Sequence, residues 1–192
     1  MQRTFICFSL AFAISACSLS PETFKETTLS DLYPILTTAQ YDSIASLSSD
    51  TAIADFVDEF WHCRDSVADS QPGELKAEYL KRVAYANLHF PDREGWGRSD
   101  RKRIYLLYGP PSFVERYDYT EDPLGPLSTM KAWEIWCYMT PAGTTSFPTY
   151  ANDVFPGQMK FIFADMTGNG FYTLLFSSEN TGDIDVRMFK RQ

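Results

Sequence analysis

A change of hydrophobic period along the chain is the feature that most limits how it folds. Between residues 37 and 90, apolar residues recur at the spacing that places side chains on one face of an α-helix. From residue 101 onward, short runs rich in β-branched and aromatic residues alternate with turn residues, a pattern typical of strands. Helices followed by consecutive strands predict an α+β fold, with N-terminal helices packed on a mostly antiparallel β-sheet.

The helical part, residues 37–90, is expected to hold three helices. Thr37 or Thr38 would cap the first, which runs to about Leu47, because a hydroxyl oxygen accepts the free N–H groups of a first turn. Ser49 or Asp50 would cap the second in the same way. The third follows Pro72-Gly73. The apolar stripes of the second and third helices are Ile53, Phe56, Val57, Phe60 and Trp61, and Leu75, Tyr79, Leu80, Val83 and Ala86.

The remaining part, about residues 101–189, is expected to form the sheet. The predicted strands are residues 103–108, 113–119, 131–139, 159–165 and 171–176, with an edge strand at 184–189. Thr167-Gly168-Asn169-Gly170 favours a hairpin turn, because Asn and Gly tolerate positive φ. Residues 140–157, rich in Pro, Thr and Gly, are expected to be a long loop. The predicted core between helices and sheet contains Trp61, Trp96, Tyr105 and Phe163.

The first residues read as a secretory signal. Arg3 precedes an apolar run from Phe5 to Ala16, which is too short to span a bilayer as a mature helix. Ile14-Ser15-Ala16-Cys17 resembles the lipobox of bacterial lipoproteins. That resemblance implies removal of residues 1–16 and acylation of Cys17 on its thiol and its new amino group. The alternative is an ordinary signal peptide cut after Ala13 or nearby.

Lipidation would place the protein on a membrane without a transmembrane helix, because several acyl chains together give stable anchoring. The polar residues 17–31 would then be a flexible tether before the domain at 32–192. Ser18 after the cysteine resembles lipoproteins that are sent on to an outer membrane, so we expect an exported protein on the periplasmic or surface face of that membrane.

The net charge argues against binding of nucleic acid, and the cysteine spacing argues against structural zinc. The net charge of −8 argues against nucleic acid, whose binding depends on Lys and Arg neutralising phosphates. Cys63 and Cys137 either form a disulfide, worth about 4 kcal/mol in the chain-entropy model, or stay as two separate buried thiols. The chain has no C-x-x-C or Cys/His spacing suited to structural zinc, and we predict neither a metal nor a cofactor.

One segment resembles a known family signature. Gly95-Trp96-Gly97-Arg98-Ser99-Asp100, followed after three residues by Ile104 to Pro111, is similar to the signature of the GWxTD domain family, exported bacterial proteins of which many are lipoproteins. Ser99 stands where that family has Thr, and one extra residue separates Trp96 from the Ser99-Asp100 pair. The motif residues are Gly95, Trp96, Ser99, Asp100, Tyr108, Gly109, Pro110 and Pro111.

Further stretches in the same order agree with the resemblance, which extends over about residues 33–176. They are Phe60-Trp61 with Arg64-Asp65, the run from Tyr79 to Phe90, Trp136-x-Tyr138, and the run from Phe161 to Tyr172. The family brings no catalytic activity that could be carried over to these residues. The resemblance therefore implies fold and location, and core architecture explains its residues without a ligand.

No catalytic residue is assigned. His62 and His89 lie on expected helices next to aromatic residues, without an identifiable nucleophile or carboxylate partner, and we expect surface or boundary histidines. The alternative hypothesis is an exported hydrolase acting on glycans through paired carboxylates. Such a pair would come from Glu134, Asp165, Asp100 and Glu115.

Binding is the function that the sequence favours over catalysis. The loop at 140–157 carries Phe147, Tyr150 and Phe155 among Pro and Thr residues. Exposed aromatic side chains on a long loop would form an interaction patch, although the same residues could instead fold back on the sheet. We expect a membrane-anchored, non-catalytic module that binds another component of the cell envelope through loop and strand-edge surface, with an envelope protein as the possible partner.

Overall fold

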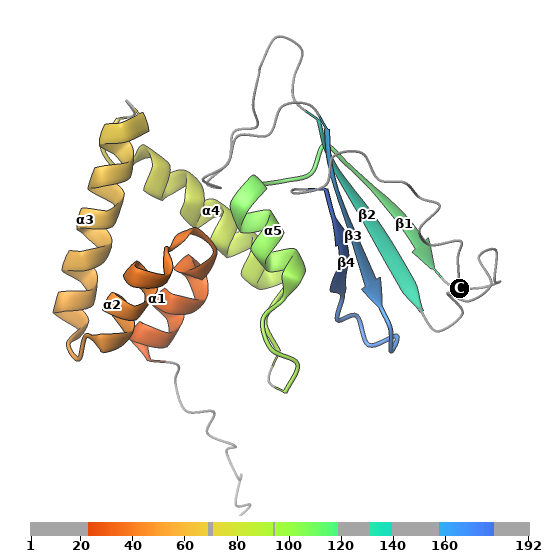
Figure 1. Ribbon diagram of the computed structural model, residues 1–192, viewed down its shortest axis with the longest axis horizontal. Helices are drawn as coiled ribbons and strands as arrows, with labels where there is room; N and C mark the ends of the chain where they lie inside the picture. Colours follow the sequence, from red (N-terminus) through yellow and green to blue (C-terminus); the bar gives the residue numbers. More distant parts are fainter. Residues whose placement is uncertain (1–22, 69–70, 94, 119–130, 140–157, 179–192) are drawn as a thin grey trace, which may run out of the picture.

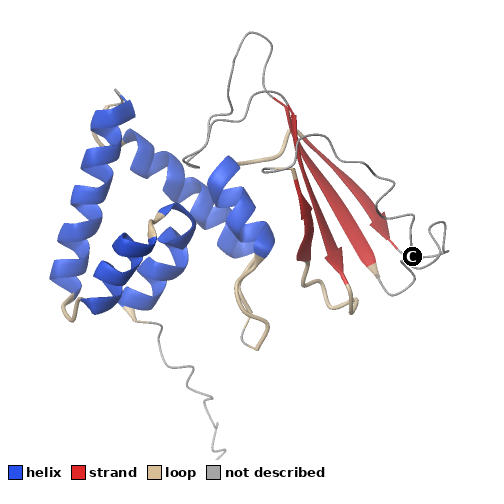
Figure 2. Cartoon of the chain, in the orientation of Figure 1, coloured by secondary structure: helices blue, strands red, loops and turns tan. Residues whose placement is uncertain are grey.

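In the part of the chain that the structure describes, a group of helices lies beside a four-stranded sheet (Figure 1). A computed structural model describes residues 23–68, 71–93, 95–118, 131–139 and 158–178. Helices account for the first part of the described chain and strands for the second, with α5 between α4 and the sheet (Figures 1 and 2). The expected α+β fold with an antiparallel sheet is confirmed.

The helical part begins earlier than the sequence suggested. Helix α1 spans Phe24–Leu32, the 3-10 helix η1 spans Tyr33–Ile35, and α2 spans Thr38–Ser46. Thr23 caps α1 in a capping box with Glu26, and Thr37 caps α2 in the same way with Gln40. The prediction of a flexible tether over 17–31 is therefore wrong from Thr23 onward, because a polar segment with this capping box forms a helix whose last residue, Leu32, is buried.

The two long helices follow the expected pattern closely. Helix α3 spans Asp50–Ala68 and α4 spans Glu74–His89, and Ser49 accepts a hydrogen bond from the N–H of Ala52 at the start of α3. The buried apolar residues of these helices are Ile53, Phe60, Trp61, Tyr79, Val83 and Ala86. Leu80 does not belong to this stripe, since 49% of its surface is exposed.

Residues 103–108 form a helix and not the predicted strand. Helix α5 spans Asp100–Tyr108, begins at the N-cap Ser99 and ends at Gly109, which has a φ of 77°. Its residues from Ile104 to Tyr108 are all buried, because α5 lies between α4 and the sheet. A short helix buried on every side has no polar face, so its apolar run has the same appearance in sequence as a buried strand.

The sheet is an antiparallel meander in the order β1-β2-β3-β4. Its strands are β1 (Phe113–Asp118), β2 (Ala132–Met139), β3 (Gln158–Asp165) and β4 (Thr173–Ser177). A bulge between Ile162 and Phe163 shifts the register of β4. Four predicted strands are thus confirmed within a few residues. The predicted strand at 184–189 and the predicted loop at 140–157 lie outside the described residues.

One continuous core joins the helices to one face of the sheet. Trp136 and Tyr138 of β2 and Phe161 and Phe163 of β3 pack in the same cluster as Trp61, Tyr79 and the buried residues of α5. The core placement predicted for Trp61, Tyr105 and Phe163 is confirmed. The placement predicted for Trp96 is wrong, because 53% of its surface is exposed. Among the described residues, no helix combines the length and hydropathy needed to cross a membrane.

Candidate functional site

The signature residues lie in the connection between α4 and α5. Arg93 and Gly97 form an isolated antiparallel bridge, which closes a tight loop around Trp96. Gly95 and Gly97 have φ values of 78° and 85°, in the left-handed region that glycine adopts without strain. Backbone hydrogen bonds from the N–H groups of Trp96 and Gly97 to the carbonyl of Arg93 complete the turn. The two glycines are therefore explained by the shape of the loop.

Trp96 projects from this loop onto the turn between β3 and β4. Its ring centroid lies 5.7 Å from that of Phe171. Arg93 links the same two segments, since its Nη1 donates to the carbonyl of Asn169 at 2.9 Å and its guanidinium lies 5.9 Å from the centroid of the Phe171 ring. The loop and the turn thus form one surface unit with an exposed tryptophan.

Ser99 and Asp100 connect the loop to its surroundings. The hydroxyl of Ser99 accepts the N–H of Lys102 as the N-cap of α5, and its own N–H donates to Asp92 at 2.7 Å. The Oδ2 of Asp100 accepts the N–H of Leu174 at 2.8 Å, which ties the start of α5 to β4. Asp100 therefore accepts a backbone N–H from the sheet while it stands at the start of a helix.

The end of the signature is also structural. Tyr108 is buried against Tyr138 and Phe161. The carbonyl of Gly109 accepts the hydroxyl of Tyr138 at 2.9 Å. A Cβ at Gly109 would lie 3.1 Å from Cζ of Arg82, whose Nη1 bonds the last carbonyls of α5. Pro110 and Pro111 follow, where the chain leaves the helix for β1 and no N–H is required.

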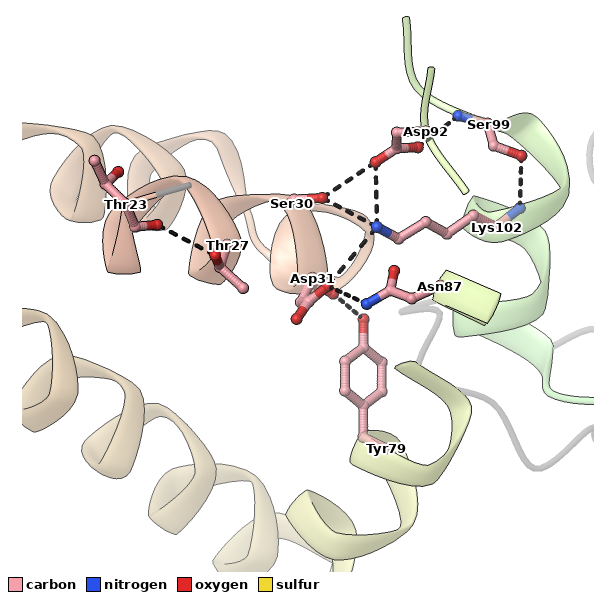
Figure 3. A network of polar contacts seen from close by, with 9 residues as sticks. All are labelled: Thr23, Thr27, Ser30, Asp31, Tyr79, Asn87, Asp92, Ser99 and Lys102. Atoms are coloured by element: carbon pink, nitrogen blue, oxygen red, sulfur yellow. Dashed lines mark hydrogen bonds and ion pairs between the residues drawn. The ribbon is translucent and has the colours of Figure 1, made fainter. Parts of the chain in front are cut away.

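A buried lysine organises the contact between α1, the signature loop and α5 (Figure 3). Lys102 is only 2% exposed. Its Nζ donates to Ser30 at 3.0 Å and to Asp92 at 3.1 Å, and lies 3.7 Å from Asp31. Ser30 in turn donates to Asp92. The cation is satisfied by groups from two other segments, α1 and the segment after α4.

Asp31 extends this network to α4. Its carboxylate accepts the side-chain amide of Asn87 at 3.2 Å, and its carbonyl accepts the hydroxyl of Tyr79 at 2.9 Å (Figure 3). Burial and then the nearby Asp31 raise the pKa of Tyr79, so this phenol is a permanent donor at neutral pH. Every one of these contacts joins one element to another.

A second charged cluster lies where α5 meets the sheet. Arg101 and Glu134 are both largely buried, with 3.4 Å between Nη1 and Oε2. Glu134 also accepts the indole N–H of Trp136 at 3.0 Å and lies 3.1 Å from Nε of Arg116 on β1. The guanidinium of Arg101 lies 4.0 Å from the centroid of the Tyr172 ring. Glu134 is thus held by three donors.

Asp165 closes the β3–β4 turn. Its Oδ1 accepts the N–H groups of Thr167 and Gly168, and its Oδ2 accepts that of Gly170 at 2.6 Å. Burial raises the pKa of Asp165, but hydrogen bonds from the backbone of Gly170, Thr167, Gly168 and Asn169 outweigh it and leave the pKa below its ordinary value. This carboxylate is a turn acceptor and stays ionised at neutral pH.

The four acids of the hydrolase hypothesis therefore have separate structural partners. Asp100 bonds β4, Asp165 bonds its own turn, Glu134 bonds two arginines and a tryptophan, and Glu115 accepts the hydroxyl of Tyr117. Within the described residues no group of three or more His, Cys, Asp and Glu side chains could hold a metal ion.

The cysteines and histidines take no part in a common site. Cys63 is exposed on α3, where it donates to Glu59 at 3.4 Å, and Cys137 is buried in β2. Both thiols are free, so the structure does not have the disulfide. The alternative of two separate buried thiols is right for Cys137 and wrong for Cys63, which is exposed. His62 and His89 are exposed, as expected. Cys17 and the aromatic residues Phe147, Tyr150 and Phe155 lie outside the described residues.

Comparison with known proteins identifies the signature. The sequence profile of the GWxTD domain matches residues 16–123, which is more than half of the 192 residues. The chain belongs to the GWxTD domain family. The match begins before α1 and ends after β1, so in this GWxTD protein it includes all five α-helices and the first strand of the described part. No curated protein and no solved structure matches the chain.

Sequence reasoning missed the two residues that organise the charged clusters of this GWxTD domain. Arg101 and Lys102 stand in a run with Arg103, and nothing in the sequence of that run shows that Lys102 is buried and that the two arginines are partly buried. The signal that could have found them is Ser99, which is a good helix cap. If a helix begins there, adjacent residues of that helix point in different directions, so neighbouring cations can have different surroundings. Reading the segment as a strand concealed that difference.

Proposed function

We propose that this GWxTD protein is an exported lipoprotein whose domain is a non-catalytic docking module for another protein of the cell envelope. Acyl chains on Cys17 would hold it on the outer membrane. The observation that carries the docking proposal is strand β1, whose six residues are all exposed. The lipobox-like Ile14-Ser15-Ala16-Cys17 supports the anchoring proposal.

The engagement of the acidic residues supports a non-catalytic module. A glycosidase needs one carboxylic acid that is protonated before the reaction, and therefore a raised pKa. The pKa of Asp165 is lowered instead. The carboxylate oxygens of Glu134 are already paired with the cations of Arg101 and Arg116.

Strand β1 has the properties of a docking edge. It pairs with β2 on one side, and within the described residues no strand pairs with its other side. Phe113, Val114 and Tyr117 are large apolar residues that it exposes. Tyr117 packs edge-on against Trp133 of β2 at 5.2 Å, which holds the ring in place.

An extended segment of a partner would fit such an edge. Backbone groups of an edge strand bind a further strand through main-chain hydrogen bonds, and pockets between side chains select the sequence. The charged residues Glu115, Arg116 and Asp118 on the same strand would restrict which partner strand is accepted.

Anchoring is tested by metabolic labelling with palmitate in cells that produce the full-length protein. We expect label in the wild type and none in Cys17→Ala, because the acylated thiol is removed. Cys63→Ala is the matched control and should keep the label, since Cys63 lies in the domain. Equal label in wild type and Cys17→Ala would overturn the anchoring proposal.

Docking is tested by a photo-crosslinking amino acid in intact cells, followed by mass spectrometry. Placed at Val114 or Tyr117, it should capture one dominant envelope protein. Placed at Leu80, which is equally exposed on α4, it should not. The adduct from Val114 should be lost in Phe113→Ser/Tyr117→Ser protein. Similar adducts from β1 and from Leu80 would contradict a docking edge.

A further inference from the structure

We infer that the side of the domain that carries the signature loop rests on the lipid surface, with Trp96 in the headgroup region. This inference rests on the proposed anchoring at Cys17. It assigns the exposed tryptophan of the GWxTD signature to a lipid bilayer, and it leaves the β1 edge to the protein partner proposed above.

Three separate segments end on the same side of the molecule. In Figure 1 the start of α1, the connection between α4 and α5, and the turn between β3 and β4 all lie along the lower edge of the domain. The contacts of Arg93 and Trp96 with the turn at 169–171 hold two of these segments together. Arg98 links the loop to α2, donating to the hydroxyl of Tyr41 at 3.2 Å. The side is therefore built as one surface.

Each of the three segments exposes a large apolar side chain. Phe24 opens α1 and is 46% exposed, Trp96 is 53% exposed, and Met166, which follows β3, is 44% exposed. Single exposed apolar residues are ordinary, but three on the tips of one side are typical of a contact surface. Tryptophan in particular favours the headgroup level, because its ring is apolar and its N–H is polar. Arg93 beside Phe171 adds a cation at the same level.

The short chain between Cys17 and α1 indicates that a bilayer, and not a protein, lies against this side of the domain. Thr23 lies six residues after Cys17, so the start of α1 is within about 20 Å of the acylated residue even if the chain between them is fully extended. Helix α1 has nine residues and is itself about 13 Å long. A bilayer that holds the acyl chains is therefore near the end of α1 that exposes Phe24.

Because the tether keeps the domain close to the bilayer, even weak contacts between the two are enough to orient the domain. A short tether converts binding into an intramolecular event with an effective concentration on the order of millimolar. A few apolar side chains then favour one orientation of the domain, although they would not bind a membrane from solution. A protein partner on this side would have to displace the bilayer that the tether already supplies.

The test uses full-length acylated protein in vesicles of phosphatidylethanolamine and phosphatidylglycerol, with and without bromine on the acyl chains. Bromine quenches tryptophan at short range, so we expect brominated lipid to reduce the emission of wild-type protein and to reduce that of Trp96→Phe much less. Phe24→Ser/Met166→Ser, which keeps Trp96 but removes the neighbouring apolar contacts, should also show reduced quenching.

The matched control moves the tryptophan to another exposed site. Leu80→Trp in the Trp96→Phe protein places an indole in the first half of α4, which starts on the opposite side of the domain in Figure 1. This indole should not be quenched by brominated lipid. Circular dichroism would show that the variants stay folded, as expected for changes at exposed positions.

Flotation and the mass of the N-terminal peptide separate the possible failures. If the acylated protein floats with the vesicles but Trp96 is as unquenched as the indole of Leu80→Trp, this inference is overturned and the anchoring proposal stands. A Trp96 that is shielded only when envelope protein is added would assign this side to a protein partner. Absence of acyl chains on Cys17 would overturn both proposals.

Discussion

At the scale of single residues, the domain depends on charges that have been moved out of water. Lys102 is the clearest case, because an almost fully buried ammonium is tolerated only when its N–H groups find oxygen atoms. Ser30, Asp31 and Asp92 supply them from α1 and from the segment after α4. The residue therefore connects these segments, and its removal would weaken the contacts between all of them.

Lys102→Met should lower the free energy of unfolding by about 2–3 kcal/mol. Removing one member of a buried ion pair costs about 3–5 kcal/mol, and the cost is smaller here because Asp31 and Asp92 remain 19% and 27% exposed. Urea denaturation measures it. Lys76→Met is the control: its pair with Asp58 is on the surface, so we expect less than about 1 kcal/mol. Equal losses in the two variants would refute the connector role.

Asp165 should contribute a pH-dependent part of the stability. Its folded-state pKa is lowered, so its contribution is fully present above the unfolded-state pKa of about 4 and is lost as pH falls through the lower folded-state value. Asp165→Asn should cost about 2 kcal/mol at pH 7, because an amide N–H₂ group would face the N–H of Gly170.

Unfolding of Asp165→Asn and wild type at a series of pH values tests this prediction. The difference between the two proteins should begin to shrink below about pH 4, where the carboxylate of the unfolded chain takes up a proton, and should shrink further as pH falls toward the lower folded-state pKa. Asp58→Asn, at an exposed carboxylate, should show little difference from wild type at any pH. If the difference in free energy of unfolding between wild type and Asp165→Asn did not change with pH, the ionised Asp165 carboxylate would not be the source of the stability.

At the scale of elements, α5 is the piece that connects the two halves of the fold. It begins at Ser99, contacts α4 and β4, and delivers the chain through Gly109 to β1. Arg82 of α4 covers the end of the helix by donating to the carbonyls of Leu106 and Leu107. The helix end therefore needs both a residue without a Cβ and a cation beside it.

Gly109→Ala should destabilise the protein by about 2–3 kcal/mol. Its φ of 77° with ψ of −158° is a conformation essentially confined to glycine, and the added Cβ would press on the guanidinium of Arg82. Gly73→Ala provides the control. That glycine has a φ of 80° and ψ of −1°, with nothing within 4 Å of a Cβ, so only about 1 kcal/mol is expected. Denaturant titration that ranks the two variants in the opposite order would disprove the argument.

At the scale of the whole molecule, helices and sheet have one core. Aromatic residues from α3, α4, α5, β2 and β3 belong to a single cluster, and Phe90 after α4 contacts Trp136 of β2 at 5.2 Å. The two charged clusters, around Lys102 and around Arg101 and Glu134, lie at the borders between elements. Neither half would bury its apolar face alone, so each stabilises the other.

The two halves should therefore unfold together. Far-ultraviolet circular dichroism, dominated by the helices, and near-ultraviolet circular dichroism of the aromatic core should give the same midpoint on heating. Trp136→Ala, a truncation in the sheet, should lower the helical midpoint as well, by an amount that corresponds to about 3–5 kcal/mol. Leu175→Ala, on an exposed position of β4, is the control with little effect. Two separate transitions in the wild type would contradict a single core.

The sequence by itself determined the fold class, the two long helices, four strands and the family. These follow from local rules, because hydrophobic period, capping residues and turn residues each act over a few positions. Ser49, Pro72-Gly73 and Thr167–Gly170 mark helix starts and a turn whatever the rest of the chain does. The capping box at Thr23 and Glu26 was equally local, and the tether prediction passed over it.

Only the tertiary structure decided the conformation of residues 103–108, the exposure of Trp96 and the roles of Arg101 and Lys102. A run of buried residues has the same composition in a helix and in a strand, so the elements packed around α5 settle which one it is. Whether a tryptophan or a lysine is buried depends on what lies opposite it, and here the opposing groups come from Phe171, Ser30 and Asp31, which no local spacing relates to them.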